Sequence, residues 1–176
     1  MKNFKELLKD IKVFIFDVDG VLSANVMNLN SETGLPVRTG NVKDGYALHL
    51  ASKLGYKIAI ITGANTEYLT SRFAALGIHD DIYLGCHNKI VEFKALMEKY
   101  NLNPENVLYM GDDIPDLKVM KMVGVPCCPA DAAPEIKEIS KYISHCKGGE
   151  GCERDVIEQV LKAQDNWLRD DEATIW

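Results

Sequence analysis

Residues 11–20, with the sequence IKVFIFDVDG, determine how the rest of the chain is interpreted. Four apolar residues, Val13–Phe16, predict a short buried strand, and the carboxylates of Asp17 and Asp19 follow it at once. Ligands of open α/β sheets bind in the crevice outside the carboxyl ends of the strands. We therefore expect a binding site at this strand end, although DVDG alone is equally compatible with a plain acidic turn.

The composition indicates a globular protein without a nucleic-acid or membrane partner. The 176 residues are 47% hydrophobic and 26% charged, which is typical of a folded domain. A net charge of −6 argues against nucleic-acid binding, which needs a basic patch. No apolar run approaches the roughly 18 residues of a membrane span, and the charged start of the chain does not resemble a signal peptide.

The cysteines indicate reduced thiols and a cytoplasmic location. They are Cys86, Cys127, Cys128, Cys146 and Cys152. Because their number is odd and none forms a Cys-x-x-Cys pair, the pattern does not predict a disulfide framework. A zinc site formed by His145, Cys146 and Cys152 is an alternative, but its spacing fits no standard zinc pattern.

Strands and helices alternate along the chain, which predicts βαβ units around a parallel sheet. After the first strand, further strands are predicted at residues 57–61, 81–84, 107–110, 125–128 and 142–143. Helices are predicted at residues 3–9, 46–54, 66–76, 89–100 and 156–163, around 117–120 and from 134 onward. Residues 1–176 are expected to form one α/β domain, a Rossmann-like doubly wound parallel sheet, with a C-terminal tail over about 147–176.

The segment of about residues 22–40 is expected to form a small β-hairpin flap. Two short extended pieces, 26–30 and 36–39, flank the turn sequence SETG. Pro36 suits an edge position in such a hairpin, because it lacks a backbone N–H. The flap would lie next to the strand end that carries DVDG.

A second acidic cluster follows another buried strand, VLYM. The sequence GDDIPD carries Asp112, Asp113 and Asp116, and a parallel sheet would place it beside Asp17. Clustered carboxylates suit Mg²⁺, which prefers oxygen ligands. The alternatives are a helix cap at Asp112 or Asp113 and a calcium loop, which Asn28 disfavours by occupying the position of the closing Glu.

Two smaller features fit the binding of a phosphate group. Thr62 and Gly63 end a strand and offer a hydroxyl and an open backbone N–H. Lys89 begins a helix and would neutralise phosphate charge. Read alone, these residues have ordinary explanations, a Thr-Gly turn and a solvated lysine. Beside two carboxylates, of which one can attack phosphorus and the other can act as a general acid, they indicate phosphoryl transfer.

The order and spacing of these pieces resemble the haloacid dehalogenase superfamily of phosphotransferases. Strand-DVDG, strand-ITG, a lysine and strand-GDDxxD cover nearly the whole chain. The resemblance implies that Asp17 is the nucleophile, which forms a phospho-aspartyl intermediate. It also implies that Asp19 acts as acid and then as base, and that Thr62 and Lys89 bind the transferring phosphoryl group.

The same resemblance implies a Mg²⁺ cofactor. The expected ligands are the carboxylates of Asp17 and Asp112 and the main-chain carbonyl of Asp19. Asp113 and Asp116 would not bind the metal themselves but would hold these ligands in position.

Most relatives carry a cap domain, and the gaps between these motifs leave room only for the flap. The segments VKDGYALHLASKLGYKIAIITG, SRFAALGI and GGEGCERDVIEQVL are similar to a capless branch of the superfamily. That similarity implies a homotetramer with active sites at subunit interfaces, where the flap and the glycine-rich tail would lie. Arg154 is expected either to reach a neighbouring site or to lie exposed at a helix start.

The similarity also implies the substrate, the phosphate of an eight-carbon keto-deoxy sugar acid used in lipopolysaccharide biosynthesis. Asp19, Thr62, Gly63 and Lys89 would contact its phosphate end. The expected contacts to the sugar acid are Asn41, Val42, Lys43, Asp44, Gly45 and Arg72. The guanidinium of Arg72 suits a carboxylate because it forms a bidentate fork.

Other interpretations stay open. Ala64 and His49 stand where many relatives have a basic residue, so a nine-carbon keto acid phosphate is the alternative substrate. A signalling receiver domain is disfavoured, because residues 84–86 stand where a receiver carries its phosphorylated Asp. A non-catalytic assembly or regulatory domain would not need the complete acidic set.

Overall fold

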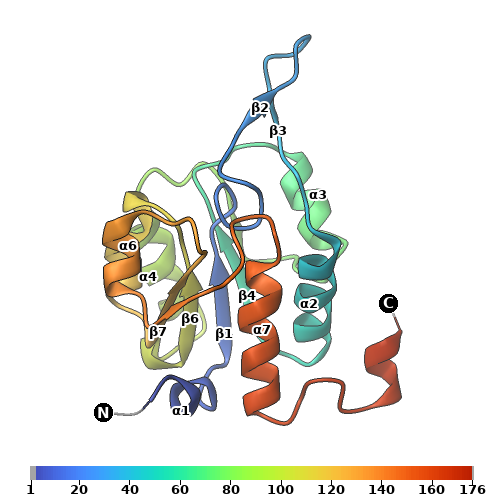
Figure 1. Ribbon diagram of the computed structural model, residues 1–176, viewed down its shortest axis with the longest axis vertical. Coiled ribbons are helices and arrows are strands. Elements are labelled where there is room, and N and C mark those ends of the chain that lie inside the picture. Colours follow the sequence, from blue (N-terminus) through green and yellow to red (C-terminus); the bar gives the residue numbers. More distant parts are fainter. Residues whose placement is uncertain (1–2, 176) are drawn as a thin grey trace.

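A computed structural model describes residues 3–175, and its centre is a six-stranded parallel sheet (Figure 1). The strands are β1 (Val13–Phe16), β4 (Lys57–Ile61), β5 (Ile82–Tyr83), β6 (Val107–Met110), β7 (Val125–Cys128) and β8 (Tyr142–Ile143). Their order is β5-β4-β1-β6-β7-β8. The chain builds outward from β1 on one side and then crosses to β6 on the other, which makes β1 and β6 the topological switch point.

Helices cover both faces of the sheet (Figure 1). They are α1 (Phe4–Leu8), α2 (Val42–Lys53), α3 (Tyr68–Ala74), α4 (Lys89–Lys99), α5 (Leu117–Met120), α6 (Pro134–Ile139) and α7 (Cys152–Ala163). Short 3₁₀ turns span Pro104–Asn106, Ile114–Asp116 and Asp171–Thr174. The doubly wound α/β architecture predicted from the sequence is confirmed.

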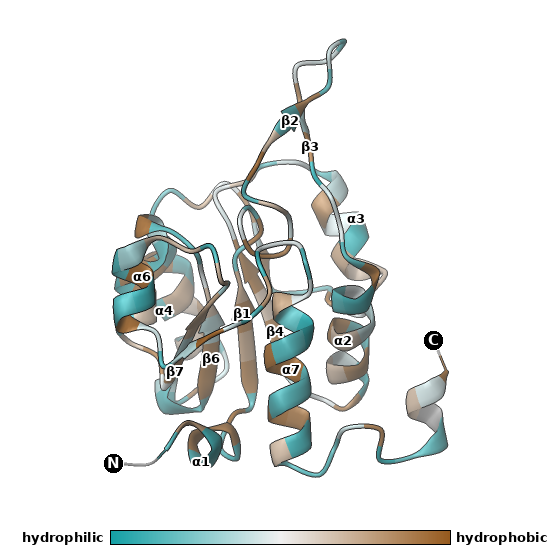
Figure 2. Cartoon of the chain, viewed as in Figure 1, coloured by the Kyte–Doolittle hydropathy of each residue, from teal (hydrophilic) through white to brown (hydrophobic). Residues whose placement is uncertain are grey.

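Alternate residues of β1 supply the two cores. Phe14 and Phe16 pack with the layer of α2, α3 and α7, whereas Val13 and Ile15 pack with the layer of α4, α5 and α6. Burial of each of these side chains contributes about 1.5–3 kcal/mol. Because both faces of a parallel strand are covered, its sequence is continuously apolar rather than alternating, and Figure 2 shows β1, β4 and β6 as hydrophobic.

The predicted flap is present as a hairpin that projects beyond the sheet (Figure 1). Its strands, β2 (Asn28–Leu29) and β3 (Pro36–Val37), pair in antiparallel fashion. Asn30 forms the turn by accepting hydrogen bonds from the backbone N–H groups of residues 32 and 33, both at 2.9 Å. The hairpin begins later than the expected start near residue 22, because Ser23 forms a bridge with Asp19 in the loop after β1.

Two helices begin earlier than the sequence predicted. Asn41 caps α2 by accepting a hydrogen bond from the backbone N–H of Lys43 at 2.8 Å. Helix α7 begins at Cys152, directly after Gly151, whose φ of 107° is open to glycine. Glycines near the two helix starts, Gly45 and Gly151, led the sequence to predict loops there. In the structure, α2 and α7 pack against each other, and this packing stabilises both first turns as helix.

The first turns of α2 and α7 share a buried pair of carboxyl groups. Asp44 is 2% exposed and Glu153 is 0% exposed. The Asp44 carboxylate accepts a hydrogen bond from the backbone N–H of Arg154 at 2.7 Å. Burial of the Glu153 carboxyl is the main cause that raises its pKa well above the usual value, and the negative charge of Asp44 raises it further. The raised pKa favours the protonated, neutral form of Glu153 beside Asp44.

Glu153→Gln tests the protonation of Glu153 through stability. A folded-state pKa above the unfolded value means that protonation of Glu153 stabilises the fold at low pH, and this contribution is lost as pH rises toward the folded pKa. Glutamine donates at every pH. The free energy of unfolding of Glu153→Gln, relative to wild type, should therefore rise between pH 5 and pH 8 in chemical denaturation.

Glu158→Gln on the same helix is the matched control. Hydrogen bonds from Lys162 and Arg154 outweigh partial burial and lower the pKa of Glu158, so this group is ionised at both pH values. Its difference from wild type should not change with pH. A pH-independent difference for Glu153→Gln would show that Glu153 is ionised in the folded protein.

Candidate active site

The ends of three strands meet at the switch point of the sheet. The backbone N–H of Asp17, after β1, donates to the carbonyl of Met110 in β6 at 3.1 Å, which ties these two strand ends together. A cavity of about 380 Å³ opens beside them. It is lined by residues that the sequence assigned to catalysis, the metal or the phosphate, namely Asp17, Asp19, Thr62, Gly63, Lys89, Asp112, Asp113 and Asp116. The structure thus brings this predicted set together.

Lys89 is a buried cation held between two carboxylates. Its Nζ lies 2.8 Å from Asp17 Oδ2 and 2.7 Å from Asp116 Oδ1, and the residue is 4% exposed. Burial alone would lower the pKa of Lys89, but the charges of Asp17 and Asp116 outweigh it and raise that pKa. Lys89 is therefore a permanent positive charge in the floor of the site, and the solvated-lysine alternative is wrong.

Asp116 supports the site without facing its opening. Besides Lys89, it accepts a hydrogen bond from the Tyr109 hydroxyl at 2.6 Å and from the backbone N–H of Asp112 at 3.2 Å. Both carboxylate oxygens of Asp116 are therefore occupied by donors. This residue fixes the position of Lys89 and of the loop that carries Asp112.

The acidic cluster has the donor set of a magnesium site. Carboxylate oxygens of Asp17, Asp112 and Asp116 lie within 4.8 Å of one another. Burial and the charge of Asp116 raise the pKa of Asp17 to about 6. Burial and the charges of Asp17 and Asp116 raise the pKa of Asp112 to about 7. Because Asp116 is already satisfied, Asp17 and Asp112 are the carboxylates that fit Mg²⁺.

Gly20 keeps this cluster compact. Its φ of 87° and the absence of a side chain let the Asp112 carboxylate pack directly against it, where a Cβ would collide. The glycine of DVDG is therefore required both by the backbone conformation and by the approach of Asp112.

Thr62 presents its hydroxyl to the cavity from the end of β4. It is 1% exposed, and its Oγ1 accepts a hydrogen bond from the backbone N–H of Ala64 at 3.1 Å. The hydroxyl hydrogen is then directed elsewhere and is available to an anion in the cavity.

The sequence analysis missed Arg38, which follows β3 in the flap. Its Nε lies 2.6 Å from Asp19 Oδ1, and its Nη2 donates to Asp19 Oδ2 at 2.8 Å. Nη1 donates to the Thr66 hydroxyl at 3.0 Å. No motif spacing predicts this contact, because it depends on the path by which the flap returns to the sheet.

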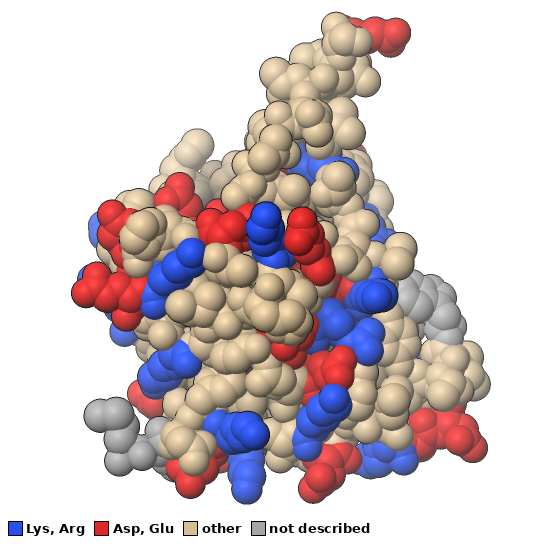
Figure 3. Space-filling model, in the orientation of Figure 1, with Lys and Arg blue, Asp and Glu red and all other residues tan. Residues whose placement is uncertain are grey.

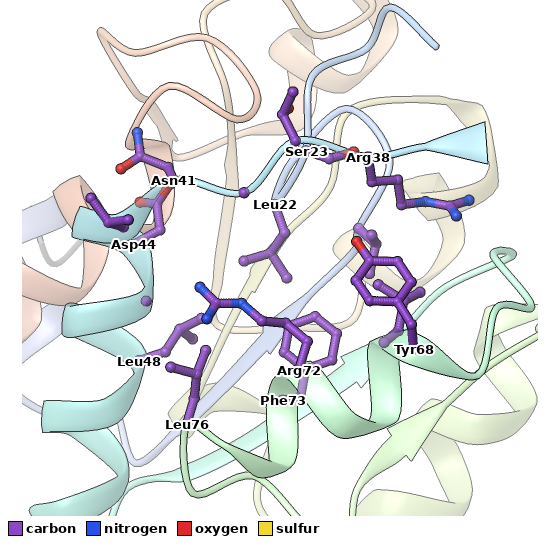
Figure 4. Close-up of a pocket in the computed structure, with 16 residues that line it drawn as sticks. Leu22, Ser23, Arg38, Asn41, Asp44, Leu48, Tyr68, Arg72, Phe73 and Leu76 are labelled. Carbon is purple, nitrogen blue, oxygen red and sulfur yellow. The ribbon is translucent and has the colours of Figure 1, made fainter. Parts of the chain in front are cut away.

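A second cavity of about 340 Å³ lies next to the first, between α2 and α3 (Figure 4). The predicted sugar-acid residues Asn41, Val42, Asp44, Gly45 and Arg72 line it, whereas Lys43 is exposed and does not. Figure 4 shows Arg72 reaching from α3 across the cavity toward α2. A Cβ on Gly45 would come within 2.9 Å of Arg72 Nη2, so glycine at this position makes room for the guanidinium.

The glycine-rich segment packs on its own chain. The backbone N–H of Gly149 donates to Val21 at 2.6 Å, and Gly148 lies so close to Gly20 that a Cβ would collide. Arg154 does not extend away either, because its guanidinium lies 4.5 Å from the ring centroid of Trp167. The tail therefore supports the loop after β1 from within the same subunit.

The zinc alternative finds no support. Over residues 3–175, the group of His, Cys, Asp and Glu side chains that is arranged to hold a metal is the aspartate cluster. His145 instead faces Asp155, with Nδ1 3.5 Å from the carboxylate. All five cysteines are free thiols. In the same residues, no helix is long and apolar enough to cross a membrane.

A parallel sheet that gathers DVDG, ITG, a buried lysine and GDDxxD at one edge defines a haloacid dehalogenase-like phosphotransferase. In agreement, residues 77–152 match the haloacid dehalogenase-like hydrolase family. The chain is 39% identical over 156 residues to the 3-deoxy-D-manno-octulosonate 8-phosphate phosphatase of Salmonella typhi. The matched region covers 89% of this chain and 82% of that protein. The chain therefore belongs to the family of these phosphatases.

Solved structures agree with this assignment. The phosphatase of the same name from Yersinia pestis superposes with a TM-score of 0.87 at 34% identity, over 92% of this chain and 86% of the other. The phosphatase from Moraxella catarrhalis, in complex with magnesium, phosphate and the sugar acid KDO, gives a TM-score of 0.87 at 34% identity, over 92% of each chain.

Magnesium binding should weaken as pH falls. Protons on Asp17 and Asp112, with pKa values of about 6 and about 7, compete with the metal below neutral pH. We expect the Mg²⁺ dissociation constant, measured by isothermal titration calorimetry, to rise roughly tenfold or more between pH 8 and pH 5.5. Asp112→Asn should lose binding, whereas Glu158→Gln, on α7 and outside the cavity lining, should keep both affinity and pH dependence. Equal affinity at both pH values would contradict these ligands.

Proposed function

We propose that this protein is a Mg²⁺-dependent phosphatase that hydrolyses 3-deoxy-D-manno-octulosonate 8-phosphate to the free sugar acid and phosphate. The reaction would supply a precursor for lipopolysaccharide biosynthesis. The observation that carries the proposal is Asp17, paired with buried Lys89 and placed within reach of Asp112 at the switch point. The family membership supports the same substrate.

In the proposed reaction, Asp17 attacks phosphorus while the bond from phosphorus to the sugar oxygen breaks. Asp19 donates a proton to that oxygen and then takes one from water, which attacks the phospho-aspartate and releases phosphate. Lys89 and the Thr62 hydroxyl hold the phosphoryl oxygens. Bound Mg²⁺ supplies charge neutralisation to the phosphate and the carboxylates.

Arg72 and the second cavity fit the other end of the substrate. Over residues 3–175, the guanidinium of Arg72 makes no hydrogen bond or ion pair, and it lines the cavity together with the apolar side chains of Phe73 and Leu76. A guanidinium in such a cavity suits the carboxylate of the keto acid. Asn41 and Gly45 line the wall along which the sugar chain would run.

Two measurements test this function. Asp17→Asn should reduce phosphate release by roughly 10⁴-fold or more, because the nucleophile is lost, while circular dichroism shows an unchanged fold. A panel of eight-carbon and nine-carbon keto acid phosphates, with hexose phosphates as controls, should show highest kcat/KM for the eight-carbon acid. Wild-type activity in Asp17→Asn would refute the nucleophile, and preference for the nine-carbon acid would establish the alternative substrate.

The flap supports the proposal of a homotetramer with active sites at subunit interfaces. Val26, Leu29 and Leu35 are 71%, 63% and 58% exposed, with Met27 and Val37 beside them. Figure 3 shows the flap as mostly uncharged. Monomeric proteins rarely leave such a contiguous apolar surface uncovered, and a second copy of the chain would cover it.

Changes on the flap should separate subunits. Leu29→Asp with Leu35→Asp should reduce the mass measured by light scattering, and activity should fall with it because a neighbouring subunit would no longer cover the active site. Glu32→Gln in the same hairpin is the control and should change neither. A wild-type monomer with full activity would contradict the shared site.

We also propose that one domain over residues 1–176 carries the activity and that it works in the cytoplasm. Five free thiols support a reducing compartment. On the face shown in Figure 3, basic and acidic side chains are intermixed, which supports a small-molecule rather than a nucleic-acid partner. The complete set of reactive groups favours an enzyme over a non-catalytic assembly domain.

A further inference from the structure

Arg38 donates hydrogen bonds to both carboxylate oxygens of Asp19. Its Nε and Nη2 lie 2.6 and 2.8 Å from Oδ1 and Oδ2, which is a bidentate fork. The Ser23 hydroxyl donates to Oδ1 as well, at 3.3 Å. Asp19 is therefore held in one orientation, although about a third of its side chain, 34%, is exposed.

Three separate segments anchor this fork. Arg38 comes from the flap, Asp19 from the loop after β1, and the Thr66 hydroxyl, which accepts from Nη1 at 3.0 Å, from the segment before α3. The Arg38 side chain is only 5% exposed. Such burial distinguishes the pair from surface ion pairs, which hold side chains loosely and contribute little.

Arg38 is also distinct from the cation of the second cavity. All three nitrogens of its guanidinium donate hydrogen bonds, two to Asp19 and one to the Thr66 hydroxyl. Figure 4 shows the guanidinium groups of Arg38 and Arg72 well apart and directed differently. Arg72 is therefore the group available to a substrate anion, whereas Arg38 acts on Asp19.

We propose that Arg38 is the positioning residue for Asp19, and that it ties the proton-transfer step to the placement of the flap. This role rests on the proposed phosphatase function, in which Asp19 protonates the leaving sugar oxygen. General acid catalysis needs the acid within hydrogen-bond reach of the leaving atom. A protonated Asp19 carries the transferred proton on one oxygen and accepts from Arg38 on the other, and the ionised form left after the transfer accepts both arms of the fork. Arg38 therefore restricts the direction of the Asp19 side chain in both forms.

The leaving group distinguishes positioning from a structural role. A sugar alkoxide is a strong base and needs a proton to leave, whereas 4-nitrophenolate leaves without one. Arg38→Ala should lower kcat/KM for the eight-carbon sugar acid phosphate by roughly 10–100-fold. For 4-nitrophenyl phosphate the loss should be less than about threefold. Arg38→Lys should lose nearly as much as Arg38→Ala, because an ammonium cannot form the fork.

A double-mutant cycle tests whether Arg38 acts through Asp19. Asp19→Asn should show the same dependence on the leaving group, and Arg38→Ala combined with Asp19→Asn should be no slower than Asp19→Asn alone. Arg169→Ala, which removes an exposed arginine of the tail, is the control and should leave both substrates unaffected.

Three results would overturn the proposal. They are an equal loss for both substrates, losses that add in the double variant, and unchanged or faster hydrolysis of the sugar acid phosphate by Arg38→Ala. A wild-type protein that releases phosphate from neither substrate would overturn the phosphatase function itself, and this role with it. The two failures are distinguishable, because failure of the Arg38 role alone is seen with a wild-type protein that still releases phosphate.

Discussion

The contact on which the site depends is the buried ammonium of Lys89 between Asp17 and Asp116. Burying several carboxylates at one strand edge is unfavourable unless a cation accompanies them, and removing one partner of such a network leaves uncompensated charge. Lys89 follows β5 at one edge of the sheet, whereas Asp116 follows β6 on the other side of β1. The lysine therefore joins the two halves of the doubly wound sheet at the candidate active site.

The loop after β1 is supported from both sides through backbone contacts. Asp112 packs on Gly20 from the β6 side, and Gly148 packs on the same glycine from the C-terminal segment. Residues far apart in sequence thus meet at one position without a side chain. The glycine-rich segment, whose composition resembles a flexible link, is a structural support for the residues proposed to bind metal and phosphate.

Much of this arrangement could be predicted from the sequence, because a continuous apolar run followed by acids defines a buried strand and its functional end. The bounds of β1 and β6 were predicted residue by residue for this reason. Arg38 could not be predicted, since its pairing with Asp19 depends on the return path of the flap. The buried Glu153 was missed as well, because the burial that raises its pKa comes from the packing of α7 against α2, which the sequence of α7 alone does not indicate.

Covalent phosphorylation of Asp17 is most directly tested by rapid-quench mixing of the wild-type protein, Mg²⁺ and substrate labelled with ³²P. We expect acid-quenched protein to carry label within the first turnover, to lose it in base as an acyl phosphate does, and to yield labelled peptide containing Asp17. Steady release of labelled phosphate from protein that never carries label would contradict a phospho-aspartyl route and would indicate direct attack by water.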